Sequence, residues 1–197
     1  FSTYLWNGDS SSTRTITTGL DMSGEGGMVA IKSRSHGQPW VIGGTGLGDN
    51  HCLAFDTTGG KDNQNSKFKA LTSTGFQIGD DHEVNSSSDS KTYSGFSFRK
   101  AKGFFDVVTW DGNDTAGRVI SHSLGSVPGL IMIKSTTHAT AWFTYHRDLG
   151  AEKYLLLNEN NAVADQTWFM NDTAPTSTGF SLGSSSNVNG SGRSYVA

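Results

Sequence analysis

The amino-acid sequence predicts an all-β fold in which two related modules form one or two antiparallel sandwiches. The hydrophobic fraction is 34% and the charged fraction 17%, while 25 glycines accompany many serines, threonines and asparagines. This composition is typical of short strands joined by frequent turns. Aromatic residues form 11% of the chain, more than a disordered sequence carries. The third observation is an internal repeat, which defines the two modules.

The repeat consists of short motifs that recur in the same order at a nearly constant distance. Arg118 follows Arg14 by 104 residues, and Lys134 follows Lys32 by 102. The clearest matches are Leu5–Gly8 with Thr109–Gly112, Met28–Ser33 with Leu130–Ser135, Leu53–Asp56 with Leu155–Asn158, and Thr72–Gly79 with Thr176–Gly183. This period is far above the roughly 20–50 residues of a solenoid unit, so it indicates a duplicated domain.

The repeat places the first module at residues 1–98 and the second at residues 104–197. We interpret the basic run 99–103 between them as a solvated linker, in preference to a site for anionic glycans. Because this linker is short, we expect the modules to pack together. The alternating segment Ser94–Phe98 follows Tyr93, whereas only two residues follow the matching Tyr195. We therefore expect the second module to be truncated in its last strand, and the chain to be a segment of a longer polypeptide.

Strand signals run through both modules, and no stretch of about 11 residues keeps helical apolar spacing. Each candidate strand is short, rich in β-branched or aromatic residues, and bounded by turn residues. In the first module the candidates are Ser2–Trp6, Thr13–Thr17, Gly27–Ser33, Trp40–Ile42, Cys52–Phe55, Phe68–Leu71, Gly75–Ile78 and Lys91–Phe98. In the second they are Phe105–Trp110, Gly117–His122, Gly129–Lys134, Ala141–His146, Tyr154–Leu157, Thr167–Met170, Gly179–Leu182 and Arg193–Ala197.

Hydrophobic patterning separates two kinds of strand. The apolar runs Met28–Ile31 and Leu130–Ile133 indicate strands that are covered on both faces. The segment Ser94–Phe98 alternates, so one of its faces is expected to meet solvent. The aromatic residues that recur in both copies, Trp6 with Trp110 and Phe76 with Phe180, are expected to pack in the core.

Composition also excludes several classes of function. The net charge is −3 and the pI about 6.0, so no basic surface argues for nucleic-acid binding. No apolar run approaches the roughly 18 residues of a membrane span, so we expect no membrane insertion. The single cysteine, Cys52, lies in an apolar run and is expected to be a buried thiol. We expect no cofactor.

No residue pattern predicts a catalytic site. A glycosidase uses a pair of carboxyl groups, but the acidic residues here are scattered through turns and no such pair recurs in both copies. The glycine-rich loop Gly43–Gly48 has no lysine after it and no helix behind it, so it does not predict a phosphate-binding loop. The sequence therefore predicts that the protein is not an enzyme.

The densest group of acidic residues offers a weak calcium candidate. It contains Asp80, Asp81 and Glu83, with Asp89 nearby. Calcium takes about six to eight oxygen ligands, most often carboxylates and carbonyls. The matching stretch Ser184–Asn187 has no carboxylate. A solvated loop is therefore the preferred interpretation, and we expect no metal.

One aromatic-rich stretch is a candidate for contact with sugars. Trp142, Tyr145, His146 and Arg147 lie close together in the second module, and Trp40 matches Trp142 in the first. Aromatic faces flanked by polar groups suit the C–H surfaces and hydroxyl groups of sugars. Alternation along a strand, however, sends Tyr145 to one face and Trp142 and His146 to the other, and one face must be core. Both the glycan-contact and the core interpretation stay open.

Several motifs together resemble a known but uncharacterised protein family. They are Phe104–Trp110, Ala116–Ile131, Tyr145–Arg147, Thr173–Thr178, Ser191-Gly192 and Tyr195–Ala197 in the second copy, with Met28–Arg34 and Tyr93–Lys100 in the first. They resemble a β-rich domain family found in large structural proteins of tailed bacteriophages, marine and cyanobacterial phages especially. The resemblance implies a lectin-like β-sandwich of jelly-roll type and assigns no catalytic residue.

The same resemblance implies a role in the phage particle. It suggests a structural, non-enzymatic domain of a virion appendage such as a tail fibre, with host-surface glycan recognition as its task. Homotrimerisation and contact with other virion proteins are implied in the same way, and localisation to the virion follows. The alternatives are a capsid-decorating or assembly domain that contacts other virion proteins, and a polysaccharide hydrolase.

Overall fold

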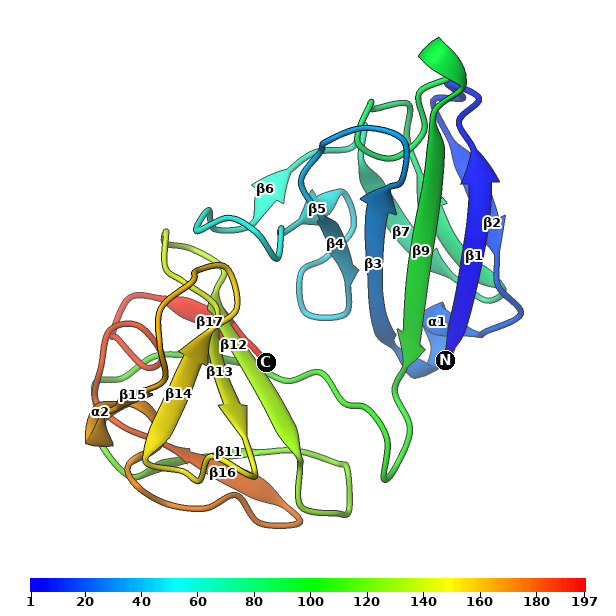
Figure 1. Cartoon of the computed structure of the whole chain (residues 1–197). Helices are drawn as coiled ribbons and strands as arrows, with labels where there is room; N and C mark the ends of the chain where they lie inside the picture. The colour runs from blue at the N-terminus through cyan, green and yellow to red at the C-terminus, as the bar shows by residue number, and fades with distance from the viewer. The chain divides into compact units, whose positions relative to one another are not determined.

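The computed structural model describes residues 1–197 and contains two compact units (Figure 1). The first unit comprises Phe1–Phe55 and Lys61–Lys100, and the second comprises Ala101–Ala197 together with Asp56–Gly60. Both are built from antiparallel strands with two four-residue helices, α1 (Met22–Glu25) and α2 (Thr167–Met170), and a 3-10 turn at Ser88–Ser90. The predicted all-β class is confirmed. Neither helix has the length and apolar character to cross a bilayer.

The first unit is a sandwich of two main sheets. One sheet has the order β1-β9-β3-β4, the facing sheet has the order β2-β8-β7, and β5 and β6 form a small ribbon. The strands are β1 (Ser2–Asn7), β2 (Arg14–Thr17), β3 (Gly27–Ser33), β4 (Val41–Gly44), β5 (His51–Cys52), β6 (Asp62–Asn63), β7 (Phe68–Thr72), β8 (Gly75–Ile78) and β9 (Thr92–Arg99). The first strand pairs with the last and the second with the next to last, which is a nested, jelly-roll type of arrangement.

The second unit repeats this nested pairing. Its larger sheet has the order β10-β17-β12-β13-β14-β15, and β11 pairs with β16 in a second sheet. The strands are β10 (Thr109–Asp111), β11 (Arg118–Ser121), β12 (Leu130–Ser135), β13 (Phe143–His146), β14 (Lys153–Leu156), β15 (Ala164–Asp165), β16 (Gly179–Leu182) and β17 (Ser194–Val196). First again pairs with last, as β10 with β17, and β11 pairs with β16. The duplicated module is therefore confirmed in the structure.

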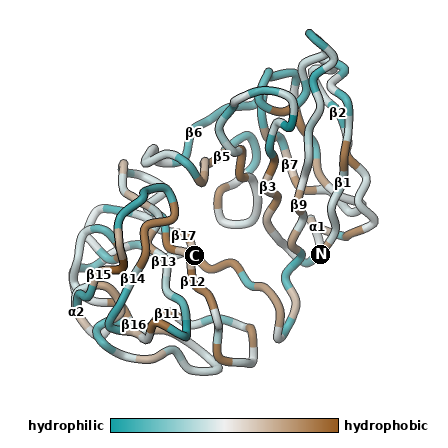
Figure 2. The backbone as a smooth tube through the Cα atoms, in the orientation of Figure 1, coloured by the Kyte–Doolittle hydropathy of each residue, from teal (hydrophilic) through white to brown (hydrophobic).

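Each core is centred on the aromatic residues that recur in the sequence. In the first unit the ring centroid of Trp6 lies 5.8 Å from that of Tyr93 and 6.2 Å from that of Phe76. In the second unit Trp110 stands 5.6 Å from Tyr195 and 5.9 Å from Phe180. All six are buried, so the predicted core role of the recurring tryptophans and phenylalanines is confirmed. Figure 2 shows hydrophobic stretches along β3 and β12, and buried residues of both strands belong to the two core clusters.

The alternating strand β9 places its small residues toward the core. An added Cβ on Gly95 would lie 3.1 Å from the Trp6 ring, and Ser97 is 1% exposed. Phe96 therefore lies on the opposite face, where its ring centroid is 6.0 Å from that of Trp40. The aromatic residues of this segment are half-buried on the outer face of the sheet, so the expected alternation is present but with its large residues outward.

The clearest difference from the predicted elements is at Thr167–Met170, which forms helix α2 instead of a strand. The helix ends at Asn171, whose left-handed backbone (φ 53°) lets its N–H bond to the Thr167 carbonyl at 2.9 Å. Phe169 and Met170 are both fully buried by one turn of helix. A run of four residues with this composition is compatible with either element, and packing decides between them.

Candidate functional site

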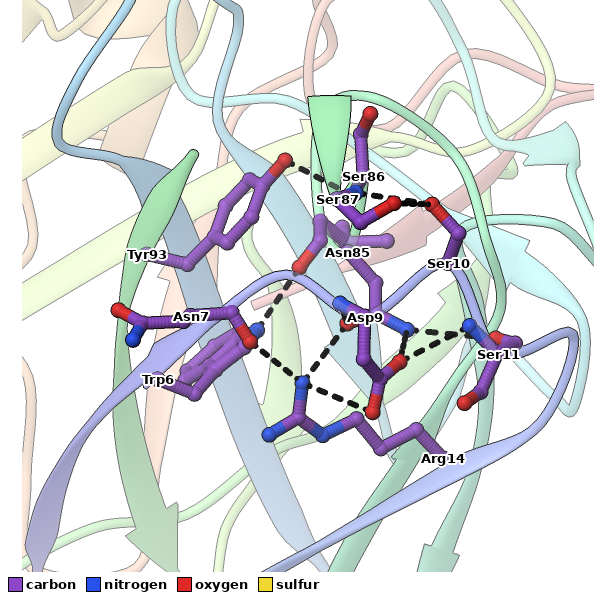
Figure 3. Close-up of polar contacts among 11 residues, drawn as sticks. Trp6, Asn7, Asp9, Ser10, Ser11, Arg14, Asn85, Ser86, Ser87 and Tyr93 are labelled. Carbon is purple, nitrogen blue, oxygen red and sulfur yellow. Dashed lines mark hydrogen bonds and ion pairs between the residues drawn. The ribbon is translucent and has the colours of Figure 1, made fainter. Parts of the chain in front are cut away.

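The residues that define the repeat form one polar network in each unit. In the first unit the Arg14 guanidinium donates to the Asn7 carbonyl at 2.6 Å and to Asn85 Oδ1 at 3.0 Å (Figure 3). It also pairs with the Asp9 carboxylate at 3.2 Å. Asn85 in turn donates through Nδ2 to Asp9 Oδ1 at 2.8 Å and to the Ser11 carbonyl at 3.2 Å. The network therefore ties the turn after β1 to the loop that precedes β9.

The second unit builds the same network with one change of charge. Arg118 donates to the Asp111 carbonyl and, at 3.1 Å, to Asn189 Oδ1. Asn189 Nδ2 donates to Asn113 Oδ1 at 3.1 Å. Asn113 is neutral where the first unit has Asp9, so Arg118 lacks the carboxylate that Arg14 has within this network. The hydrogen bonds of the arginine are the same in both units, but the ion pair between Asp9 and Arg14 is not repeated at Asn113 and Arg118.

The core tryptophan and tyrosine of each unit form hydrogen bonds with the backbone next to its polar network. Trp6 Nε1 donates to the Val84 carbonyl at 2.9 Å, and Trp110 Nε1 donates to the Val188 carbonyl at 3.0 Å. The Tyr195 hydroxyl donates to the Ser186 carbonyl at 2.7 Å and accepts from the Gly190 amide at 2.8 Å. Burial raises the pKa of both core tyrosines, so their hydroxyl groups keep their protons well into alkaline solution.

These networks are structural. Their polar groups bond to one another and to the backbone. Burial acts to raise the pKa of Asp9, but hydrogen bonds from Ser11 and Asn85 and the charge of Arg14 bring it below its usual value. The backbones also approach closely, since a Cβ on Gly8 would lie 1.8 Å from the Ser86 carbonyl oxygen. The recurring motifs therefore specify the module.

The predicted sugar-contact residues are not assembled into one surface. Trp142 and Tyr145 are each 4% exposed, and Tyr145 belongs to the core of the second unit together with its strand neighbour Phe143. Neither ring is therefore a solvent-facing platform, and the face of β13 that carries Tyr145 is the core face. His146 and Arg147 are exposed at the end of the strand.

The remaining residue of that prediction, Trp40, lies in the first unit and is half-buried. Its ring centroid lies 5.9 Å from that of Phe55, and the Lys32 ammonium stands 5.7 Å above it. The ring is thus engaged with its neighbours on the outer face of the sheet.

The calcium candidates are separated in the structure. Asp81 and Glu83 lie close together with His82, but Asp80 and Asp89 are exposed elsewhere on the loops. The Glu83 carboxylate is already paired with the Lys67 ammonium at 2.7 Å, and Asp81 Oδ1 accepts the Glu83 amide. An ammonium group beside the carboxylate opposes a second cation, so the charge that calcium needs is neutralised within the protein.

Two further titratable groups are buried for structural reasons. Cys52 is buried, as predicted, and burial raises the pKa of its thiol to about 11, which suppresses the reactive thiolate. Lys134 is fully buried, and burial lowers the pKa of its ammonium to about 8. Its Nζ donates to the Thr140 carbonyl at 2.6 Å and to the Thr58 carbonyl at 2.8 Å. Both lysine hydrogen bonds satisfy backbone oxygens.

A pocket of about 320 Å³ in the second unit was not anticipated from the sequence. It opens beside α2, and its lining residues are Ala116, Gln166, Thr167, Trp168, Asn171, Gly183 and Ser184. No side chain of this lining carries a charge. Gln166, Thr167 and Ser184 are exposed, while Trp168 and Asn171 are half-buried. Such a surface offers hydrogen bonds without electrostatic selection.

The helix α2 beside the pocket matches residues 65–68 of the first unit, which form a turn and the first residue of β7. A Cβ on Gly183 would strike the Trp168 backbone, just as a Cβ on Gly79 would strike the backbone of Ser66. Trp168 therefore occupies the place of Ser66. Its ring packs 5.5 Å from Phe143 and 5.2 Å from Tyr154, measured between centroids. One sequence feature could have indicated this site: Trp168 is aromatic, whereas the matching residue of the first copy, Ser66, is not.

Comparisons with known proteins identify the module but not its activity. No curated protein and no solved structure is significantly similar to the chain. One family model, described as a domain of unknown function (DUF7483), matches residues 1–105 and again residues 94–197. These two matches cover the whole chain and follow the two units of the structure. The protein therefore belongs to the DUF7483 family and carries two copies of its domain.

Proposed function

We propose that the chain is a non-enzymatic binding module that recognises neutral saccharides on a host-cell surface through the pocket beside α2. The observation that carries this proposal is the set of residues that line the pocket, which places Trp168 beside residues with amide and hydroxyl side chains and includes no charged residue. An aromatic wall suits the C–H face of a sugar ring, and the amides of Gln166 and Asn171 suit its hydroxyl groups.

The size and openness of the site set the expected strength of binding. A volume of about 320 Å³ lies at the low end of the roughly 300–1,000 Å³ typical of ligand pockets, so one site holds only a small part of a glycan. Single-site affinity is therefore weak. Several modules displayed together would bind a cell surface far more tightly through effective concentration.

The resemblance to phage structural proteins supports a place for this binding in a virion appendage such as a tail fibre. In this proposal the module is displayed outside the particle, forms homotrimers and contacts other virion proteins. Display of several copies on one appendage would compensate for the weak affinity of each single site. The host-surface glycan is then the partner from which the appendage gains its specificity.

The lining of the pocket also favours binding over hydrolysis. Glycosidases use two carboxyl groups, either about 5–5.5 Å or about 6.5–9.5 Å apart, on either side of the scissile bond. None of the seven lining residues is an aspartate or a glutamate. A saccharide held here meets donors and acceptors that orient it but no acid that would protonate a leaving group.

The test is binding of the purified chain, as monomer and as an engineered trimer, to an array of neutral and charged glycans. We expect neutral glycans to bind and the change Trp168→Ser, which installs the residue of the first unit, to abolish binding. Tyr4→Ser is the matched control, because Tyr4 is an exposed aromatic residue of the first unit. Gln166→Ala tests the same site with an exposed side chain. Binding that survives both pocket changes would contradict the proposal.

A further inference from the structure

A short segment of the first repeat copy is packed in the second unit. The residues Asp56–Gly60 fall within the first copy by sequence, but their contacts assign them to the unit that contains Ala101–Ala197. We call these five residues the strap. The Thr58 carbonyl of the strap accepts hydrogen bonds from the Thr140 amide at 2.9 Å and from the Lys134 ammonium at 2.8 Å. Both bonds therefore converge on one oxygen atom.

Lys134 is sealed where the strap meets β12. It is 0% exposed, and its Nζ also donates to the Thr140 carbonyl at 2.6 Å. The first unit repeats this last bond, because the matching Lys32 donates to the Gln38 carbonyl, but Lys32 is half-buried. The bond to the residue six positions later is thus a feature of the module, whereas the bond to Thr58 is made by the strap.

The strap fits tightly at one point and loosely elsewhere. A Cβ added to Gly60 would lie 2.9 Å from the Thr136 carbonyl oxygen, whereas a Cβ added to Gly59 would meet the Thr57 hydroxyl at 3.8 Å. The residues Asp56–Gly59 are exposed, so opening of the strap would uncover little apolar surface. Segments with few buried contacts open locally at a lower free energy than the unit that carries them.

We propose that the strap is a latch that closes over Lys134, seals its ammonium group from water, and opens without unfolding of the second unit. In the closed state the Thr58 carbonyl takes the place of water as an acceptor for the ammonium group. In the open state water returns to Lys134, and the Thr140 amide loses its acceptor. The latch is separate from the saccharide pocket beside α2 and does not depend on the proposed function.

The charge of Lys134 couples this latch to pH. Burial in the closed state lowers the pKa of the ammonium from 10.5 to about 8, whereas contact with water in the open state restores the pKa toward its ordinary value. Between these values closure releases a proton, so the closed strap gains stability as the pH rises from about 8 toward 10. Below pH 8 the ammonium is charged in both states, and closure is weakest.

Burial alone sets this response of Lys134. The titratable groups on the elements around it are Asp56 on the strap, His138 on the loop after β12 and Tyr195 on β17. Burial is the cause of the lowered pKa of Lys134, and no charged neighbour contributes. Histidine side chains are largely neutral above pH 7.5, and the raised pKa of Tyr195 lies above 10. A response between pH 8 and 9.5 therefore reports Lys134.

Hydrogen exchange of the intact chain, measured by NMR, tests the latch. The Thr140 amide bonds to the strap, and the Gly183 amide, which bonds to the buried Phe169 at 3.0 Å, reports unfolding of the unit. We expect Thr140 to be less protected than Gly183, and its protection factor to rise by at most about tenfold per pH unit from pH 8 to 9.5. Lys134→Met should abolish this rise. Equal protection of the two amides, or the same rise in the variant, would overturn the proposal.

Matched glycine variants test whether the strap covers the lysine. Gly60→Ala places a methyl group against the Thr136 carbonyl and should open the strap, whereas Gly59→Ala makes the same change where there is room. Acetylation of Lys134 at pH 8, measured by mass spectrometry against the exposed Lys102, should rise about tenfold or more in Gly60→Ala and stay at the parent level in Gly59→Ala. Circular dichroism verifies that both variants fold. Acetylation at the parent level in folded Gly60→Ala would refute the latch.

Discussion

The two units share their strand pairing but differ at one corner, next to β8 in the first and β16 in the second. The first unit has strand β7 there, with the Lys67 ammonium 2.7 Å from the Glu83 carboxylate. The second has helix α2, and Phe169 and Asn187 stand where the ion pair would be. The backbone bond from Gly183 to the Phe169 carbonyl copies the bond from Gly79 to the Lys67 carbonyl, so the two corners are directly comparable.

The corner next to β8 in the first unit is polar, whereas the matching corner next to β16 in the second unit is aromatic. Phe143, Tyr154, Trp168 and Phe169 form one cluster with ring centroids 5.2–6.1 Å apart. In the first unit the corresponding side chains include Val41 and Cys52, which are smaller. The polar network around Arg14 or Arg118 is present in both units. The residues at the corner differ between the units while this network stays the same. The candidate saccharide pocket lies where the two copies diverge.

The largest effect is expected when the corner of the first unit is imposed on the second. Phe169→Lys buries an ammonium group without a partner and removes a fully buried ring, so it should destabilise the second unit by roughly 3–5 kcal/mol. Adding Asn187→Glu supplies the missing carboxylate and should recover part of the loss. Chemical denaturation followed by tryptophan fluorescence measures both. A single variant as stable as the parent would show that the corners are not equivalent.

Alkaline pH should stabilise the second unit through Lys134. The pKa of its buried ammonium is lowered from 10.5 to about 8, so between these values the unfolded chain binds the proton and the folded chain does not. Stability should therefore rise with pH from about 8 toward 10, by at most about 1.4 kcal/mol per pH unit. Lys134→Met should flatten this rise, as urea denaturation at a series of pH values would reveal. Above pH 10 the raised pKa values of Tyr93 and Tyr195 act in the opposite direction.

The shared network predicts a graded pair of effects. Asn85→Ala and Asn189→Ala each remove a buried amide and should cost roughly 1–3 kcal/mol. The loss should be greater at Asn189, because Arg14 keeps the Asp9 carboxylate whereas Arg118 faces neutral Asn113. Thermal unfolding of the two variants side by side would check the order. Equal losses would mean that the Asp9 ion pair contributes little.

The smallest effect is expected at the ion pair itself. Glu83→Gln leaves the Lys67 ammonium without its partner, but the side chain of Lys67 is 19% exposed and can turn toward water. We expect a loss of about 1 kcal/mol in the free energy of unfolding, which Lys67→Met in the same chain should largely restore. If the single change alone stabilises the first unit, the desolvation cost of the pair exceeds its attraction.

Much of the fold follows from local patterns. We could predict the repeat, the strand content and the core role of Trp6, Phe76 and their counterparts. Strands are recognisable in a sequence because runs of β-branched and aromatic residues lie between turn residues. Helix α2 could not, since a four-residue run such as Thr167–Met170 has no resolvable period. The prediction for Tyr145 had the same limit, because alternation identifies two faces without saying which one is covered.

By itself the sequence determined that this protein contains two copies of one β module, and which recurring residues hold each copy together. Those facts depend on short-range pattern and on self-similarity, both of which are readable in one dimension. Tertiary structure alone decided the pocket, which brings together residues from three parts of the chain: Ala116, then Gln166, Thr167, Trp168 and Asn171, and finally Gly183 and Ser184. No short-range pattern marks this site, because its residues become neighbours only when the chain folds.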